Sequence, residues 1–251
     1  LRADVARVFP DKPADWVEDA VRRQRIHRAW VAIDKVIFPR VSAAEIIART
    51  DPASIEAARE VCDAALARGN GGIIYTLHFG RPTLSPIVLA NLGYPYVALR
   101  AAERGSRIDD DLRDHVKQAG VEEVHASDLT SGVNAMRALK RNKLFFALID
   151  GQVTQRPTMV EFFGQRVPIS LGFAMLARRT GAALIAGVTF SDGPFRFRMY
   201  PQAVELPSGD LSEEEIGAHL MRPLEEAVRR DPGQWYGVNR MFRKARKLAA
   251  V

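Results

Sequence analysis

Two polar side chains, His78 and Asp150, each stand at the end of an apolar run. His78 follows "GIIYTL" (residues 72–77), and Asp150 closes "KLFFALID" (residues 143–150). In a parallel α/β sheet, the carboxyl ends of the strands line the crevice in which ligands bind. A histidine placed there can act as a general base if a partner orients its ring. Both residues are therefore candidate site residues.

Each of the two residues also has a purely structural alternative. A turn histidine can simply hydrogen-bond the backbone, and the sequence favours neither role for His78. Asp150 precedes Gly151, and an Asp-Gly pair is typical of a turn in which the carboxylate binds nearby backbone. The other histidines lack a strand-end position and are interpreted as surface or partly buried residues; they are His27, His115, His125 and His219.

Strand-like and helix-like patterns alternate from residue 71 onward. Helices are predicted over residues 82–92, 107–119, 130–142 and 170–180, between strand-like runs such as "GIIYTL", "YPYVAL", "EEVHA", "KLFFALID" and "ALIAGVTF". We interpret "TMVEFFG" (158–164) as a loop and "FRFRMY" (195–200) as a half-exposed strand. Strands separated by helices predict an α/β fold with a mostly parallel central sheet flanked by helices.

The N-terminal part is predicted to be helical. Residues 13–38 place Trp16, Trp30, Ile33 and Ile37 on one side and several arginines elsewhere, which fits either a helix packed on the core or a helix lying on a membrane surface. No Pro/Gly/Ser-rich or charge-block linker interrupts the 251 residues. We expect one domain over residues 1–251, with a helical part (1–70) before an α/β core (71–251).

The formal net charge of +6 favours an anionic partner. Nucleic acid, an anionic membrane surface and an acidic carrier protein all qualify by charge. No aromatic-and-basic RNA motif or zinc-finger spacing appears in the sequence, so we expect no nucleic-acid partner. No run approaches the ~18 apolar residues of a membrane span. The single cysteine, Cys62, lies on the apolar face of a predicted helix and is interpreted as a core residue.

Three blocks of the chain carry a resemblance to a known family: "LHFGRPTLSPIVLANLGYPYVALR" (77–100), "LIDGQVTQRPTMVEFFGQRVPISLGFAMLARRTGAALIAGV" (148–188) and "DPGQWYGVNRMFRK" (231–244). The first is similar to H-F/L-G-N-W-E followed by a helix and G-Y-P. The second resembles a D-Q block with F-F-G and a small-residue helix, and the third resembles P-x-Q-W-x-W-x-H-R. Together the blocks resemble the lipid A biosynthesis lauroyl/myristoyl acyltransferases of the lysophospholipid acyltransferase superfamily, which implies a glycerolipid-acyltransferase-like fold.

The resemblance implies a mechanism based on an H-x4-D/E motif. The carboxylate holds the imidazole in one tautomer, while the other ring nitrogen removes a proton from an acceptor hydroxyl that attacks an acyl thioester. His78 matches the histidine, but Thr83 stands where the acid is expected. A hydroxyl accepts a hydrogen bond without supplying a negative charge, so Thr83 would orient the ring only weakly.

This departure leaves three alternatives open. A carboxylate from elsewhere, with Asp150 as the leading candidate, orients His78. Alternatively, the acceptor is an amine, which is nucleophilic once neutral and demands less of the base. In the third alternative, the site has lost acyl transfer and retains only binding.

Further site residues follow from the resemblance. Asp150 matches the aspartate of the second block. Phe162 and Phe163 suit an acyl-chain groove, although paired aromatics also occur in ordinary cores. Candidate substrate-binding arginines are Arg81, which replaces the family's asparagine, and Arg156 and Arg166, which flank the F-F-G loop and suit a phosphate or an acidic carrier, or are plain surface charges.

The sequence thus leads to one main hypothesis and two rivals. The main one is a divergent acyltransferase with His78 as base, which transfers an acyl group from acyl carrier protein or acyl-CoA to a hydroxyl or amine, without metal or cofactor. The first rival is a degenerate relative that binds acyl carrier protein or lipid without turnover. The second is a peripheral membrane-binding module. We expect a cytoplasmic protein, free or peripheral at the inner face of the membrane.

Overall fold

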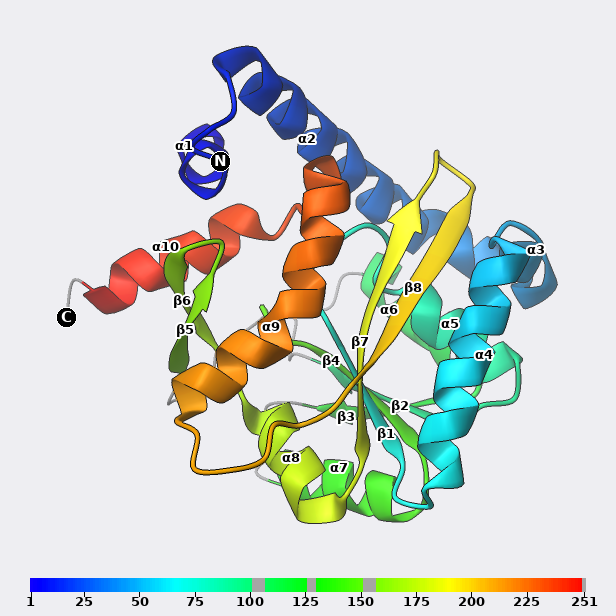
Figure 1. Cartoon of the computed structure of the whole chain (residues 1–251). Helices are drawn as coiled ribbons and strands as arrows, with labels where there is room; N and C mark the ends of the chain where they lie inside the picture. The colour runs from blue at the N-terminus through cyan, green and yellow to red at the C-terminus, as the bar shows by residue number, and fades with distance from the viewer. Residues whose placement is uncertain (101–106, 126–129, 151–156, 250–251) are drawn as a thin grey trace.

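The computed structural model describes residues 1–100, 107–125, 130–150 and 157–249 (Figure 1). The helices are α1 (Arg2–Val8), α2 (Ala14–Ile37), η1 (Phe38–Arg40), α3 (Ala43–Ala48), α4 (Pro52–Ala67), α5 (Leu84–Asn91), α6 (Arg107–Gln118), α7 (Ser131–Lys140), α8 (Gly172–Thr180), α9 (Glu213–Arg230), η2 (Pro232–Gln234) and α10 (Val238–Ala249). The strands are β1 (Gly72–Thr76), β2 (Tyr96–Arg100), β3 (Val121–His125), β4 (Leu144–Leu148), β5 (Thr158–Phe162), β6 (Gln165–Ile169), β7 (Ala183–Ser191) and β8 (Phe197–Val204).

The predicted fold class is confirmed. Six strands form one sheet in the order β3-β2-β4-β1-β7-β8. All neighbouring pairs are parallel except β7–β8, which is antiparallel. The central strands are buried on both faces, and this is why they appear in the sequence as continuous apolar runs.

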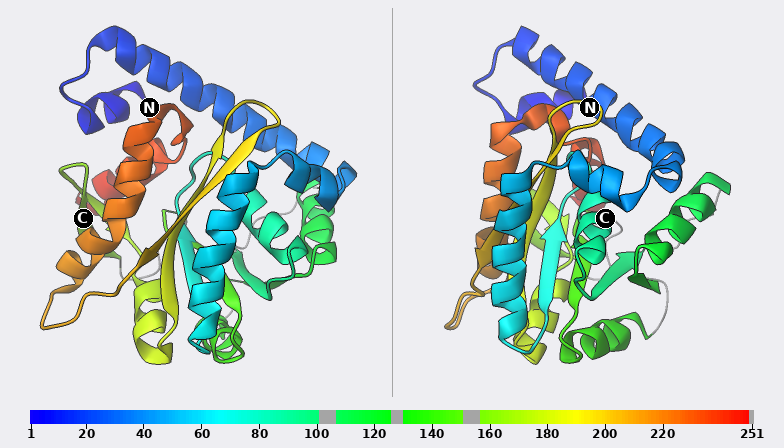
Figure 2. Two further views of the ribbon diagram at one scale, coloured as in Figure 1. Left: turned by 45° about the vertical axis from the view of Figure 1, so that its right-hand side comes forward. Right: turned by 90° about the vertical axis from the view of Figure 1, so that its right-hand side faces the viewer.

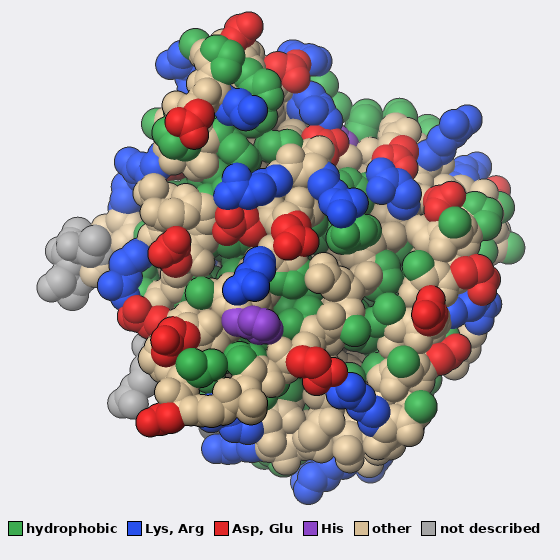
Figure 3. Space-filling model, viewed as in Figure 1, with side chains coloured by type: hydrophobic (Ala, Val, Ile, Leu, Met, Phe, Trp, Pro, Cys, Tyr) green, Lys and Arg blue, Asp and Glu red, His purple; other side chains and the backbone are tan. Residues whose placement is uncertain are grey.

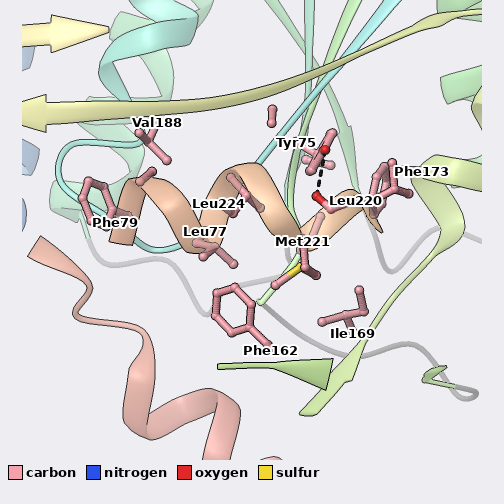
Figure 4. Packing of buried hydrophobic residues seen from close by; sticks show 14 of the residues in the cluster. Tyr75, Leu77, Phe79, Phe162, Ile169, Phe173, Val188, Leu220, Met221 and Leu224 are labelled. Atoms are coloured by element: carbon pink, nitrogen blue, oxygen red, sulfur yellow. Dashed lines mark hydrogen bonds between the residues drawn. The ribbon is translucent and has the colours of Figure 1, made fainter. Parts of the chain in front are cut away.

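Successive residues of β1 belong to opposite layers of the molecule. Ile73 and Tyr75 join a core cluster that includes residues of α7, α8 and α9, whereas Ile74 joins a second cluster with α4 and α5. The views in Figure 2 show these helices on the two faces of the sheet. In the first layer, the Tyr75 hydroxyl donates a hydrogen bond to the Leu220 carbonyl of α9 at 2.9 Å (Figure 4). Cys62 of α4 is buried in the second layer, as expected.

The segment "TMVEFFG" forms a strand and a turn, so its interpretation as a loop is wrong. β5 pairs antiparallel with β6, and its buried residues Val160 and Phe162 flank the exposed Glu161. The connecting residues Phe163 and Gly164 both have positive φ, at 54° and 65°, as a type I′ hairpin turn requires. Phenylalanine seldom adopts this conformation, which explains why the sequence concealed the hairpin.

Helix α2 packs on the molecule through the apolar residues Val17, Ala20 and Val21 near its start and through polar side chains farther along. Its buried residues include Gln24, His27 and Asp34, whereas Ile33 is 49% exposed. Of the predicted apolar side, Trp16 packs against the core whereas Ile33 is exposed. The interpretation of His27 as a surface or partly buried residue is wrong, because its side chain is buried. The Gln24 amide donates to the Pro232 carbonyl at 3.0 Å.

A buried ion pair joins α2 to the loop that follows His78. The guanidinium of Arg81, which is 1% exposed, pairs with Asp34. It also donates to the carbonyls of Trp30 and Pro194, each at 3.3 Å. Burial raises the pKa of Asp34, and the hydrogen bond and charge of Arg81 oppose this increase. Arg81 therefore holds α2 across the carboxyl end of the sheet.

We predict that Arg81→Met strongly destabilises the fold. Removing one partner of a buried ion pair leaves the other charge uncompensated, which typically costs about 3–5 kcal/mol. Arg166→Met is the matched control, because its ion pair with Glu214 is exposed on both sides and such pairs contribute about 0–1 kcal/mol. Urea unfolding of the two variants measures the difference; equal losses would contradict the structural role of Arg81.

Candidate active site

His78 and Asp150 occupy equivalent positions on two adjacent parallel strands. The β1–β4 register pairs Gly72 with Leu144 and Thr76 with Leu148. Each candidate lies two residues beyond the end of its strand, and the ladder continues there through an Ile149 N–H bond to the Thr76 carbonyl at 2.9 Å. The pairing of the strands therefore brings the two side chains together.

The Asp150 carboxylate makes three hydrogen-bond contacts with His78. Its Oδ1 lies 2.7 Å from the ring Nδ1, and both of its oxygens accept from the His78 backbone N–H at 3.0 and 3.1 Å. An ionised carboxylate can only accept, so the ring proton must lie on Nδ1. Nε2 is then left with a lone pair, as a general base requires.

Asp150 is held in its ionised form. Its side chain is fully buried, while that of His78 is 18% exposed. Burial acts to raise the pKa of Asp150, but the charge and hydrogen bonds of His78, with a contribution from Arg240, leave the pKa below its ordinary value of 3.8. The interaction with His78 therefore stabilises the fold at pH values above the ordinary pKa of an aspartate. This stabilisation is lost as the pH falls through the pKa that Asp150 has in the folded protein.

Helix α10 and the segment before it bring further groups to the imidazole. Arg240 places its guanidinium 3.2 Å from Nε2 of His78; because a guanidinium has no acceptor, this contact also requires a lone pair on Nε2. The Tyr236 ring meets the imidazole edge-to-face at 6.0 Å. Burial, followed by the charge of Asp150, raises the pKa of the Tyr236 phenol, so it remains protonated.

Two glycines allow the backbone to approach this closely. A Cβ on Gly237 would lie 2.4 Å from Asp150 Oδ2 and 3.0 Å from the His78 Cβ. Gly80 has φ +52°, and a Cβ there would lie 1.9 Å from the Thr189 carbonyl oxygen. Backbone bonds from Gly237 N–H to the His78 carbonyl (3.2 Å) and from Gly80 N–H to the Gln234 carbonyl (2.9 Å) join the two segments.

Thr83, the predicted weak orienter, lies at the N-cap of α5. Among the described residues, its hydroxyl makes no hydrogen bond with the imidazole, whose Nδ1 is bound to Asp150. Of the three alternatives that the sequence left open, the geometry matches the one in which a carboxylate from elsewhere in the chain orients His78.

The candidate substrate-binding arginines do not gather at this site. Arg81 is buried against Asp34 of α2, and Arg166 lies on the surface beside Glu214 of α9. Arg156 lies outside the described residues. Within the described part of the chain, the cations near the imidazole come from α10 instead.

Phe162 and Phe163 lie in the core, next to the segment before α10. Both are buried, and Phe163 stacks on the Trp235 ring at 5.8 Å while Phe162 meets it edge-to-face at 5.4 Å. The Arg229 guanidinium lies over the Phe163 ring, 4.6 Å from the ring centre. Both rings are therefore packed against the segment that carries Tyr236 and Gly237, and the role of Phe162 and Phe163 in an acyl-chain groove stays a prediction.

Sequence reasoning missed Arg240, Tyr236 and Gly237. All three lie in the quoted block "DPGQWYGVNRMFRK", but nothing in their spacing indicates contact with a histidine some 160 residues earlier. Over residues 1–100, 107–125, 130–150 and 157–249, no group of three or more His, Cys, Asp or Glu side chains is suited to hold a metal ion. No helix in those same residues is long and apolar enough to cross a membrane.

Comparison with known proteins relates this geometry to a family. The family model described as bacterial lipid A biosynthesis acyltransferase matches residues 1–244. Two Mycobacterium tuberculosis proteins, from strains CDC 1551 / Oshkosh and ATCC 25618 / H37Rv, are both named phosphatidylinositol mannoside acyltransferase. Each is 24% identical over 180 residues, which cover 69% of this chain. The aligned region spans 55% of the length of these curated relatives. Since the family match extends over almost all of the chain, the protein belongs to the bacterial lipid A biosynthesis acyltransferase family.

Proposed function

We propose that this protein transfers an acyl group from a thioester donor to a hydroxyl or amine of a lipid acceptor. His78 is the general base, and Asp150 orients it. The observation that carries the proposal is the 2.7 Å contact between His78 Nδ1 and the buried Asp150 carboxylate. Membership of the acyltransferase family supports acyl transfer as the type of reaction.

In the proposed reaction, Nε2 of His78 first accepts a proton from the acceptor and later gives it to the leaving group. The imidazole removes the proton from the acceptor O–H or N–H while the acceptor atom bonds to the thioester carbonyl carbon. The carbonyl electron pair moves onto its oxygen and forms a tetrahedral oxyanion. The oxyanion then returns its electron pair to re-form the carbonyl of the product while the C–S bond breaks, and the leaving thiolate takes the proton from Nε2. Asp150 stays ionised and stabilises the imidazolium between the two steps.

In this proposal, Asp150 replaces the acid that is missing at Thr83. It supplies the negative charge that a threonine hydroxyl lacks, and it holds the ring and the backbone of His78 together. An amine acceptor is then not needed to explain the altered motif, because the base keeps a charged orienting partner. We therefore leave Thr83 outside the proton path.

The donor is proposed to be acyl carrier protein or acyl-CoA, both of which present anionic groups beside a thioester. The charge of +6 suits either donor. On the face that carries α9, lysine and arginine side chains are interspersed with aspartate and glutamate (Figure 3). This mixture argues against α9 as a carrier-docking surface. The name of the mycobacterial relatives suggests a mannosylated phospholipid as the first acceptor to test.

We propose that the outer face of α2 contacts the membrane. Exposed apolar side chains Ile26, Ile33 and Val36 lie along this helix, near the exposed arginines Arg22 and Arg25. An apolar stripe flanked by cations suits the boundary of an anionic bilayer. This placement would bring the carboxyl end of the sheet close to a lipid acceptor.

We predict that His78→Ala and Asp150→Asn each abolish most of the transfer activity. General-base catalysis contributes about 10²–10⁴-fold, and loss of the charged orienting group has cost a serine protease ~10⁴ in kcat. Product formation from acyl carrier protein and acyl-CoA donors, offered with the mannosylated phospholipid and with alcohols and amines, is followed by mass spectrometry. His219→Ala is the control, because this partly buried histidine of α9 hydrogen-bonds the Glu205 carbonyl, away from the site.

Two results of that experiment would contradict the proposal. Full activity of His78→Ala would remove His78 from the mechanism. Binding of the donor by the wild-type protein, with no turnover for any acceptor, would instead favour the degenerate, binding-only relative.

A separate prediction concerns Thr83→Ala. Because the ring is already bound to Asp150, we expect kcat to fall by less than about tenfold, far below the loss for Asp150→Asn. Steady-state kinetics of both variants with one donor and acceptor pair test this. A Thr83→Ala loss that matches the Asp150→Asn loss would place the threonine in the proton path.

We also predict that Ile33→Glu weakens binding to anionic vesicles, because it places a carboxylate on the apolar face of α2. Val133→Glu is the matched control: this valine of α7 is exposed to the same degree, 48% against 49% for Ile33. Cosedimentation with phosphatidylglycerol-containing vesicles measures the effect. Equal binding by both variants would rule out α2 as the membrane contact.

A further inference from the structure

We infer that Arg240 and Lys244 of α10 form the oxyanion-binding site for the tetrahedral intermediate. The inference rests on the acyl transfer proposed above and assigns a role to two residues that lie outside the His78–Asp150 dyad. One residue contacts the base directly, and the other is a partly buried lysine whose Nζ is buried without a hydrogen-bond partner among the described residues.

Arg240 lies where a group that acts on the reacting carbonyl has to be. Its guanidinium is 3.2 Å from Nε2 of His78, the atom from which the acceptor is deprotonated in the proposed reaction. When an acceptor hydroxyl donates a hydrogen bond to the lone pair of Nε2, it displaces the N–H of Arg240. That N–H is then free beside the attacking oxygen. The oxyanion forms on the carbon bonded to that oxygen, within reach of the released donor.

Lys244 supplies a second donor one helical turn farther along α10. Residues four apart lie on the same face of a helix, so Lys244 follows Arg240 along the side that faces the site. Its Nζ is buried and has no hydrogen-bond partner in the part of the chain that the structure describes. Burial lowers the pKa of Lys244; Asp150 opposes this shift, and Arg240 and Arg243 add to it.

The charges around the dyad explain why an anion is the expected occupant. Arg240 and Lys244 offer only donors. The one carboxylate described in contact with the imidazole, Asp150, is already satisfied by three contacts with His78. A buried ammonium without an acceptor is costly, and a developing negative charge on the substrate would relieve that cost only in the transition state. Such differential binding raises kcat rather than substrate affinity.

The test compares Arg240→Ala, Arg240→Lys and Lys244→Met with Arg243→Ala. Arg243 lies on the same helix and is exposed, so it controls for the general loss of positive charge. Removal of an oxyanion donor is expected to lower kcat about 10²–10³-fold with little change in the donor KM. Arg240→Lys should retain part of the activity, and added guanidinium should partly restore Arg240→Ala. Arg243→Ala should leave kcat close to the wild-type value, because its exposed side chain offers no donor to the oxyanion.

A measurement of binding alone tests the anion site independently of the proposed function. A long-chain alkylphosphonate mimics the tetrahedral oxyanion and needs no turnover. Its affinity, measured by calorimetry, should fall at least tenfold in Arg240→Ala and Lys244→Met and stay unchanged in Arg243→Ala. His78→Ala should lose turnover yet still bind the phosphonate.

Three outcomes would overturn the inference. The first is wild-type kcat and phosphonate affinity in Arg240→Ala while His78→Ala is inactive. The second is a rise in the acceptor KM alone, which would make the two cations a binding site for an acceptor phosphate. The third is an equal loss in Arg243→Ala, which would show only a long-range charge effect. Absence of turnover in the wild-type protein would instead refute the proposed function, and phosphonate binding would still decide the anion site.

Discussion

The parallel register between β1 and β4 is the constraint on which the candidate site depends. It places His78 and Asp150 opposite each other two residues beyond the strands. A slip of one residue would exchange the two faces of β1, moving Ile74 into the layer of Tyr75, and would also separate imidazole from carboxylate. The hydrophobic layers that fix the register therefore also fix the geometry of the dyad.

The segment before α10 then closes the site from a third direction. Gly237 approaches Asp150 so closely that only a residue without a side chain fits. Behind it, Trp235 is fully buried among Phe162, Phe163 and other core residues. The start of α10, and with it the guanidinium of Arg240, is thus positioned by aromatic packing. A site with one buried carboxylate and cations from a separate helix results from this arrangement.

Helix α2 has a different relation to the core. Its start packs on the core through Val17, Ala20 and Val21. The Gln24 amide and the Arg81–Asp34 pair hold the rest of the helix against the loops at the carboxyl end of the sheet. In that later part the buried residues Gln24, His27 and Asp34 are polar, and apolar residues such as Ile33 lie on the outer face. The proposed contact with lipid would use this exposed apolar surface and the arginines beside it.

The sequence by itself determined the α/β class, the helix positions of the core, and the two strand-end residues His78 and Asp150. These follow from local periodicity, since buried parallel strands and amphipathic helices leave distinct patterns in the chain. The resemblance to the family, now supported by a match over residues 1–244, also came from short motifs.

Only the tertiary structure decided which groups meet. Asp150 rather than Thr83 binds His78 because of the strand order. β4 lies beside β1 in the sheet, although β2 and β3 come between them in the sequence. The buried polar side of α2, the Phe163 turn and the approach of Arg240 were hidden for the same reason. Each depends on contacts between distant segments, in which burial and ion pairing outweigh local preference, and no local pattern records such contacts.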